Sequence, residues 1–269
     1  MYLKRINLFA STISIPAVPK SRRLLVFASL CCGMVSGIFS TASLADTPAK
    51  SSINLPPSAT LEYTIKAKQS GITLSGDASV MWKTGNQRYS IITETRAMLI
   101  GKILDVSSVG GVDSYGLAPE KFNEKRLGKP ETITNFNRKG DKKSITFSES
   151  AERYPIKGGE QDRSSATWQL VGLARAAGDK FKPGSEWKMF VAGRRDAETW
   201  SFKVMQRETL ATGMGNLMTV HVVKLPPPNS KSQHIDLWLA PALEWYPVRV
   251  LFSDVDGDYI EQLIGQIKK

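Results

Sequence analysis

The residues whose types could support covalent catalysis are a serine–lysine pair and a lysine-containing triplet. Ser185-x-x-Lys188 and Lys83-Thr84-Gly85 match short motifs of hydrolases that work through an acyl-serine. In those enzymes the serine opens a helix, so that the lysine one turn later lies beside it. Here Pro183-Gly184 predicts a turn into a strand, where a residue three positions on points to the opposite face. The motifs also occur in reverse order, and we interpret both as chance matches.

The two histidines, His221 and His234, do not predict a catalytic relay. Such a relay needs a serine on an exposed elbow, and no Gly-x-Ser-x-Gly motif follows residue 45. His221 lies between two valines, which favours an ordinary strand residue over a general base. Two separated histidines without a cysteine after residue 45 do not supply the ligands of a zinc site. We expect neither a metal nor a cofactor.

The densest acidic cluster is Asp254-Val255-Asp256-Gly257-Asp258. Alternate aspartates can ligate calcium, but helix-loop-helix calcium loops have glycine in sixth position, and here it is fourth. Asp256-Gly257 between two strand patterns is also a strong hairpin signal. We favour the turn and keep a calcium site as the alternative.

The elements that would position these residues are mostly strands, because hydrophobic residues alternate with polar ones over most of the chain after residue 58. Leu61, Tyr63, Ile65 and Ala67 face one way in the first such segment. Sustained alternation predicts antiparallel strands with one buried and one solvated face. Further strands are predicted at 72–82, 87–96, 103–114, 121–127, 131–138, 142–148, 200–205, 216–224, 234–239, 248–254 and 258–267.

One segment follows a helical period instead. An apolar stripe predicts a helix at 166–177, with Asp162 or Ser164 capping its start and Gly178 stopping it. The stripe consists of Leu170, Val171, Ala174 and Ala177. We therefore expect a mostly β fold, a single large curved antiparallel sheet that resembles a half-barrel or barrel. The one main α-helix would pack on the concave side or plug the mouth.

The first 45 residues have the features of a secretory signal peptide. Arg22 and Arg23 precede an apolar stretch of about 16 residues, short of the roughly 20 that span a bilayer. Ser43-Leu44-Ala45 is a small-residue cleavage site. We predict cleavage after Ala45, a periplasmic location and no transmembrane span in the mature chain, with an uncleaved anchor as the alternative. The predicted organisation is a signal peptide at 1–45, a flexible leader at 46–58 and one β-rich domain at 59–269.

Composition limits the partners of the mature chain. Both cysteines, Cys31 and Cys32, lie in the predicted signal, so stability must come from a core without disulfides. Removing the five basic residues of the signal lowers the formal charge from +11 to about +6. In the periplasm this excludes nucleic acid as a normal partner and leaves anionic lipid, lipopolysaccharide or peptidoglycan. One predicted hairpin tip could contact anionic headgroups, although we favour a solvated turn; its basic residues are Arg138, Lys139, Lys142 and Lys143.

The C-terminal third contains short motifs in a characteristic order. They are Ile235-Asp236-Leu237-Trp238-Leu239-Ala240-Pro241, Tyr246-Pro247-Val248-Arg249-Val250 and Asp256-Gly257, preceded by Gly116-Leu117-Ala118-Pro119 and Gln161-Asp162-Arg163. In order and spacing, the chain resembles the proteobacterial domain of unknown function 3108 family over most of 61–263. The resemblance implies an exported β-rich protein and supplies no catalytic residues. The expected architecture is also similar to that of periplasmic lipoprotein carriers, in which a curved sheet and helices enclose an apolar hollow.

The sequence leads to one favoured function and two alternatives. The favoured one is a non-catalytic periplasmic binding or carrier protein for a lipid, an envelope glycolipid or another apolar envelope component. Its groove would be lined by Trp200, Phe202, Leu237, Leu239, Val248 and Val250. The first alternative is an envelope scaffold that contacts a protein through its outer sheet face and the basic hairpin. The second is a cell-envelope hydrolase with Asp162, Asp236 or Asp256 as its candidate acids.

Overall fold

The structure, a computed structural model, describes residue 50 and the ranges 52–225 and 234–269. The predicted signal peptide, its cleavage site and both cysteines lie outside the described residues. The chain divides into two units, Met1–Thr47 and Pro48–Lys269. Every described element and core residue belongs to the second unit.

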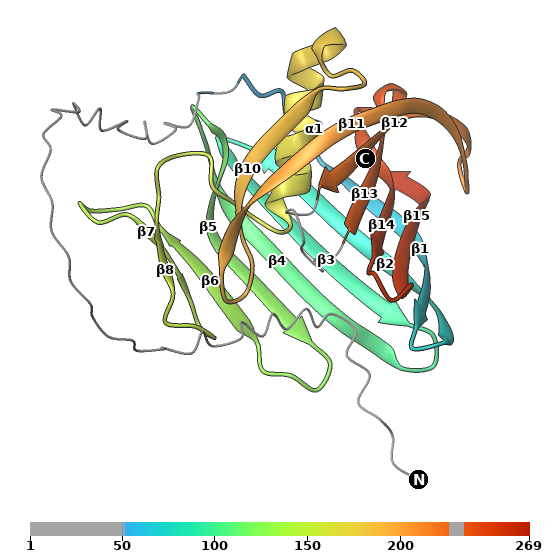
Figure 1. The fold of residues 1–269 in the computed structure, drawn as a ribbon, viewed down its shortest axis with the longest axis horizontal. Helices are drawn as coiled ribbons and strands as arrows, with labels where there is room; N and C mark the ends of the chain where they lie inside the picture. Colours follow the sequence, from blue (N-terminus) through green and yellow to red (C-terminus); the bar gives the residue numbers. More distant parts are fainter. Residues whose placement is uncertain (1–49, 51, 226–233) are drawn as a thin grey trace, which may run out of the picture. The chain divides into compact units, whose positions relative to one another are not determined.

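The second unit is built on one large sheet. Its strands are β1 (Ala59–Gln69), β2 (Ile72–Gly85), β3 (Arg88–Ala97), β4 (Gly101–Asp113), β5 (Gly116–Arg126), β6 (Thr132–Asn137), β7 (Ser144–Phe147), β8 (Arg153–Pro155), β9 (Gln161–Asp162), β10 (Glu186–Ala192), β11 (Ala197–Thr212), β12 (Gly215–Leu225), β13 (His234–Ala240), β14 (Tyr246–Ser253) and β15 (Tyr259–Lys268). The spatial order of the 15 strands is β8-β7-β6-β5-β4-β3-β2-β1-β15-β14-β13-β12-β11-β10-β9. Neighbouring strands are antiparallel, apart from β9 and β10. The prediction of a single curved antiparallel sheet is confirmed. The sheet is open because its two edge strands, β8 and β9, do not pair with each other (Figure 1).

Alternating burial confirms the predicted strand faces. Along β1, Leu61, Tyr63, Ile65 and Ala67 are all buried, while Thr64 is exposed. We call the face that carries these buried residues the inner face of the sheet. The edge strands β8 and β9 are absent from the sequence-based prediction because segments of three and two residues are too short to show a period.

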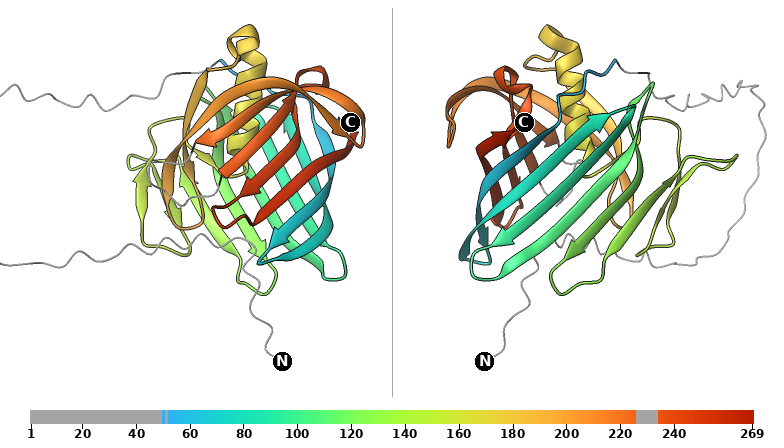
Figure 2. Two further views of the ribbon diagram at one scale, coloured as in Figure 1. Left: turned by 45° about the vertical axis from the view of Figure 1, so that its right-hand side comes forward. Right: turned by 180° about the vertical axis from the view of Figure 1, so that it is seen from behind.

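The predicted helix is present as α1 (Ser165–Ala177) and lies against the concave side of the sheet (Figures 1 and 2). Gly178 stops it with φ of 53°, as expected. Of the two proposed caps, Asp162 is the right one: its carboxylate accepts the N–H groups of Ser164 and Ser165, whereas the Ser164 side chain makes no cap bond. Short 3₁₀ turns follow at Gly178–Lys180 and Pro241–Leu243. In the described ranges no helix is both long and apolar enough to cross a membrane.

The core fills the space between α1 and the inner face. One cluster packs the helix against β10–β14, a second covers β1–β3 and the start of β14, and a third lies on β4–β7. The distal part of the long β11–β12 hairpin, residues 205–219, extends past the first cluster, and we call it the arm. Its tip reaches β15, where the Gly213 N–H donates to the carbonyl of Ile264 at 3.2 Å.

Candidate functional site

The six residues predicted to line a ligand groove are all buried in the core. Five belong to the cluster that α1 forms with β10–β14, namely Trp200, Phe202, Leu237, Leu239 and Val250. Val248 lies in the neighbouring cluster, with Tyr246 and Trp168. The inner face at these positions is therefore covered by α1 and its flanking residues.

The start of α1 is joined to the inner face by a buried chain of polar groups. Ser108 on β4 donates its hydroxyl to Asp162 Oδ2 at 2.5 Å, so the Tyr89 hydroxyl, 3.0 Å from Ser108 Oγ, is the donor in the next bond. Oδ1 of Asp162 accepts the amides of Ser164 and Ser165, each at 2.8 Å. Burial raises the pKa of the Asp162 carboxyl from 3.8 to about 6, against the opposing effect of these hydrogen bonds. Burial and the nearby Asp162 charge raise the pKa of the Tyr89 hydroxyl.

Residues 53–57, which we call the strap, run along α1. The Asn54 N–H donates to the Gly172 carbonyl at 3.0 Å, and Nε of Arg175 donates to the Asn54 carbonyl at 3.2 Å. A Cβ at position 172 would lie only 2.4 Å from Cγ1 of Ile53. Glycine therefore allows this close approach of strap and helix.

Two aromatic side chains tie the strap to the sheet. Trp82 Nε1 donates to the Pro56 carbonyl at 3.0 Å, and the Tyr246 hydroxyl donates to the Pro57 carbonyl at 2.7 Å. The Trp82 ring also stacks on Trp168 of α1, with centroids 4.4 Å apart and planes within 8°. The strap, which falls within the predicted leader, is thus connected to both the helix and the sheet.

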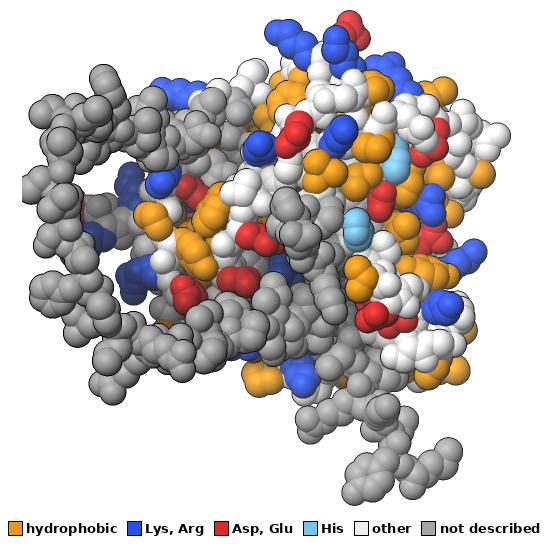
Figure 3. Space-filling view, in the orientation of Figure 1, with side chains coloured by type: hydrophobic (Ala, Val, Ile, Leu, Met, Phe, Trp, Pro, Cys, Tyr) orange, Lys and Arg blue, Asp and Glu red, His pale blue; other side chains and the backbone are white. Residues whose placement is uncertain are grey.

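The outer face of the sheet carries a stacked group of aromatic and charged residues on β12, β13 and β14. The His221 and Trp238 rings are parallel within 3° at 4.4 Å, and the Arg249 guanidinium lies 4.2 Å from the Trp238 ring centroid. His221 Nε2 is 2.7 Å from Asp236 Oδ1, and Nδ1 is 3.9 Å from Glu208 of the arm. We call these five residues the outer-face stack. Histidine side chains, pale blue in Figure 3, are visible at the surface beside acidic ones.

The outer-face stack has two capabilities. The His221 imidazole is within hydrogen-bond distance of Asp236 and only within ion-pair distance of Glu208, so it can exchange a proton with Asp236 alone. The stack also holds the arm to the sheet, because Trp238 Nε1 donates to Glu208 Oε1 at 2.5 Å. The sequence places Asp236 and Trp238 on one strand face, but their partners come from β11, β12 and β14. Alternation within one strand does not specify the register between strands, so this grouping had no sequence signal.

The three candidate acids lie in different settings. Asp162 is buried at the start of α1, Asp236 belongs to the outer-face stack, and Asp256 is exposed. Asp256 lies in the turn between β14 and β15, where Asp254 accepts the N–H groups of residues 256 and 258. The hairpin interpretation of this cluster is confirmed. The structure does not bring the three carboxylates together.

The serine–lysine pair also has the predicted strand geometry. Ser185 directly precedes β10, and its hydroxyl donates to the Lys182 carbonyl at 2.8 Å. Lys188 lies within β10, where its ammonium is 3.5 Å from Glu186. Each side chain is thus engaged with a local partner.

The predicted basic tip is the β6–β7 hairpin. Lys139, Lys142 and Lys143 are exposed there. Arg138 differs, because its Nε donates to the Pro119 carbonyl at 2.8 Å and Nη2 to the Glu160 carbonyl at 3.3 Å. The structure therefore groups the three lysines and directs the arginine toward the sheet.

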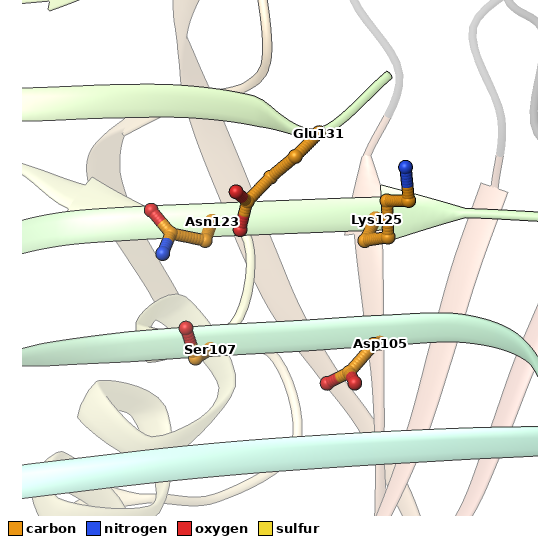
Figure 4. Close-up of a pocket in the computed structure, with 5 residues that line it drawn as sticks. All are labelled: Asp105, Ser107, Asn123, Lys125 and Glu131. Carbon is orange, nitrogen blue, oxygen red and sulfur yellow. The ribbon is translucent and has the colours of Figure 1, made fainter. Parts of the chain in front are cut away.

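A shallow depression of about 360 Å³ lies on the outer side of β4 and β5 (Figure 4). Register pairs Asp105 with Lys125 and Ser107 with Asn123, and Glu131 completes the lining. Figure 4 shows the Lys125 ammonium directed away from the Asp105 carboxylate. All five lining side chains are polar, so this depression does not suit an apolar ligand.

Together these features define a class: an open, curved antiparallel sheet whose concave side is occupied by one strapped helix. The chain belongs to the family described as "Protein of unknown function (DUF3108)", which matches residues 62–263 and confirms the resemblance seen in the motifs. It is also similar to a crystal structure from Vibrio parahaemolyticus, described as a candidate outer membrane lipoprotein-sorting protein domain. That comparison covers 79% of this chain and 85% of the other, with 9% identity and a TM-score of 0.29, too low to carry an argument. No curated protein matches the chain.

Proposed function

We propose that this protein is a non-catalytic periplasmic binding or carrier protein that holds an apolar, lipid-like envelope component on the inner face of its sheet. Helix α1 would be the displaceable cover of that site. The observation that supports the proposal is how the inner face is buried. Phe202 and Leu237 are inaccessible beneath a single 13-residue helix and not beneath a second sheet.

The two ends of α1 are held differently, which indicates where a ligand would enter. At its start, Asp162 is hydrogen-bonded to the sheet, and Gln169 donates to Tyr115 and accepts from Leu117, each at 2.8 Å. Farther along, Leu173 and Ala174 make apolar contacts. The polar bonds of this half run to the strap and to Glu244, and not to strands of the sheet: Arg175 donates to the Asn54 carbonyl and pairs with Glu244. Apolar contacts are non-directional, so an acyl chain can replace them at little cost, whereas buried hydrogen bonds need specific partners. A ligand would therefore displace the C-terminal half of α1.

The strap allows a direct test in residues 46–269, which contain no cysteine. Ile53→Cys combined with Gly172→Cys would link strap and helix by a disulfide, since Cγ1 of Ile53 already lies 2.4 Å from the Cβ position of residue 172. We expect the reduced double variant to bind the fluorescent apolar probe N-phenyl-1-naphthylamine. Oxidation should weaken this binding at least tenfold, and reductant should restore it.

The single variant Ile53→Cys, treated with the same oxidant, is the matched control and should bind the probe in both states. Equal probe binding by the oxidised and reduced double variant would refute the role of α1 as the cover. Native mass spectrometry after purification without detergent, together with solvent extraction, tests for cargo. A clean apo mass and no uptake of added envelope lipids would overturn the carrier proposal and favour the interaction scaffold.

A further inference from the structure

Three hairpins, β1–β2, β3–β4 and β5–β6, turn at the same end of the sheet (Figure 2). Successive antiparallel strands reverse direction, so these turns share one rim, and the turns β2–β3, β4–β5 and β6–β7 share the other. The strand pairing places these turns in the same way, because Gln69 pairs with Ile72 at one tip and residue 97 pairs with residue 101 at the next. Neighbouring tips on a rim are two strands apart, which is about 10 Å.

The first rim is apolar and the second is polar. The tips of the first carry exposed hydrophobic side chains, which we call the apolar rim: Ile72 (56% exposed), Met98 (67%), Leu99 (101%), Ile100 (46%) and Leu127 (60%). The opposite tips consist of polar residues such as Asn86, Gln87 and Ser114, together with the basic hairpin. Polar residues and glycine are the usual choice for turns, so the composition of the first rim needs another reason.

The backbone at Leu99 supports this conclusion. Its φ of 69° lies in the left-handed region, which glycine or asparagine adopts with less strain than leucine. The turn is held on both sides of it, because the Met98 N–H donates to Ser75 at 2.9 Å and the Ile100 N–H to Ala97 at 3.2 Å. A fully exposed leucine in a strained position contributes neither to turn geometry nor to the core. Positive φ also occurs at Asn86 and Gln87 of the polar rim, but those side chains are polar, so it is the apolar side chain of Leu99 that favours a role outside the fold.

We propose that the apolar rim docks on the surface of a lipid bilayer that contains anionic phospholipid. Lys68, Lys125 and Lys129 are exposed beside the tips, against the carboxylates of Glu131 and of Asp258, which accepts the Ser70 N–H of the first tip. Lys102 is also there, within ion-pair distance of two carboxylates. Apolar side chains at the headgroup boundary with lysines beside them match what an anionic membrane surface offers.

The spacing of the tips favours a membrane over a protein partner. Separate apolar points about 10 Å apart can each enter a fluid surface, whereas a protein would need a matching pocket for each tip. The contact ends at the β14–β15 turn, where Val255 is exposed but stands among three aspartates. This docking does not depend on the carrier proposal, because it involves exposed turns and not the inner face.

An environment-sensitive dye on a single cysteine tests the docking directly. In residues 46–269, Leu99→Cys labelled with acrylodan should shift its emission to the blue on addition of vesicles of phosphatidylethanolamine and phosphatidylglycerol (7:3). Asn86→Cys, on the polar rim, is the matched control and should not shift. Equal shifts at both positions, or none at Leu99→Cys, would overturn the proposal.

Substitutions then measure what the rim contributes. In flotation assays with the same vesicles, Met98→Asp combined with Leu99→Asp should lower the partition coefficient at least tenfold. Met218→Asp replaces an equally apolar, 56% exposed residue of the arm and should leave partitioning within twofold. Lys125→Glu combined with Lys129→Glu should weaken binding to these vesicles and leave binding to phosphatidylcholine vesicles unchanged. If Met218→Asp lost binding as much as the Met98→Asp and Leu99→Asp double variant, the contact would not be specific to the rim.

Discussion

The buried carboxyl of Asp162 makes a prediction about how stability depends on pH. It is completely inaccessible, and burial raises its pKa from 3.8 to about 6. Because the folded-state pKa lies above the unfolded one, the folded protein binds this proton more tightly. The resulting stabilisation is complete below pH 3.8 and is lost as pH rises through 6. A shift of this size corresponds to about 3 kcal/mol between those limits.

The variant Asp162→Asn isolates this contribution. Asparagine keeps the size of the side chain and an oxygen for the amides of Ser164 and Ser165, but it does not titrate. The part of the free-energy cost of this substitution that does not depend on pH shifts the difference between variant and wild type by the same amount at each pH, so it does not affect the trend. The free energy of unfolding of the variant minus that of wild type should therefore increase by about 2 kcal/mol from pH 4 to pH 7. Taking this difference also cancels the titration of the other carboxylates, such as Glu94, whose pKa is lowered by Lys102 and Arg96.

Urea unfolding of residues 46–269, followed by tryptophan fluorescence at four pH values, measures this difference. Ser108→Ala provides a second arm, because it removes a hydrogen bond that lowers the Asp162 pKa. In that variant, the loss of stability should occur at higher pH than in wild type. A difference between Asp162→Asn and wild type that stays flat or decreases with pH would refute the argument.

Three further predictions concern packing around the sheet. Gly110→Ala should destabilise the protein by about 2 kcal/mol or more in the same urea assay, since a Cβ there would lie 2.2 Å from a backbone oxygen. Gly111→Ala is the control and should be tolerated, because a Cβ at that position meets nothing closer than 3.7 Å. Trp238→Ala should release the arm, seen as faster hydrogen exchange at the Gly213 amide; unchanged exchange there would argue against the outer-face stack as its attachment. Trp82→Phe removes the bond to the strap and should cost about 1 to 2 kcal/mol, so wild-type stability of that variant would contradict the role of the strap.

Local patterns in the sequence determined most of the secondary structure. Alternation along Leu61–Ala67 predicts β1 and its buried face, because side chains of a strand point to opposite sides whatever lies around them. Gly178 predicts the end of α1 for an equally local reason, since it adopts a positive φ without steric cost. The family motifs, which extend over the matched residues 62–263, were also recognisable from sequence alone.

The tertiary structure alone decided which residues share a site. His221 and Trp238 meet because β12 pairs with β13 in one register, and a pattern within either strand is compatible with several registers. Asp162 titrates near pH 6 because distant strands and the helix remove it from water, and no neighbour in sequence reports that. Ile72 fits the alternation of a buried strand face, yet it is 56% exposed because β2 begins at the rim, beyond the reach of the core. Burial and register depend on contacts between residues far apart in the chain, and these exist only once the sheet has formed.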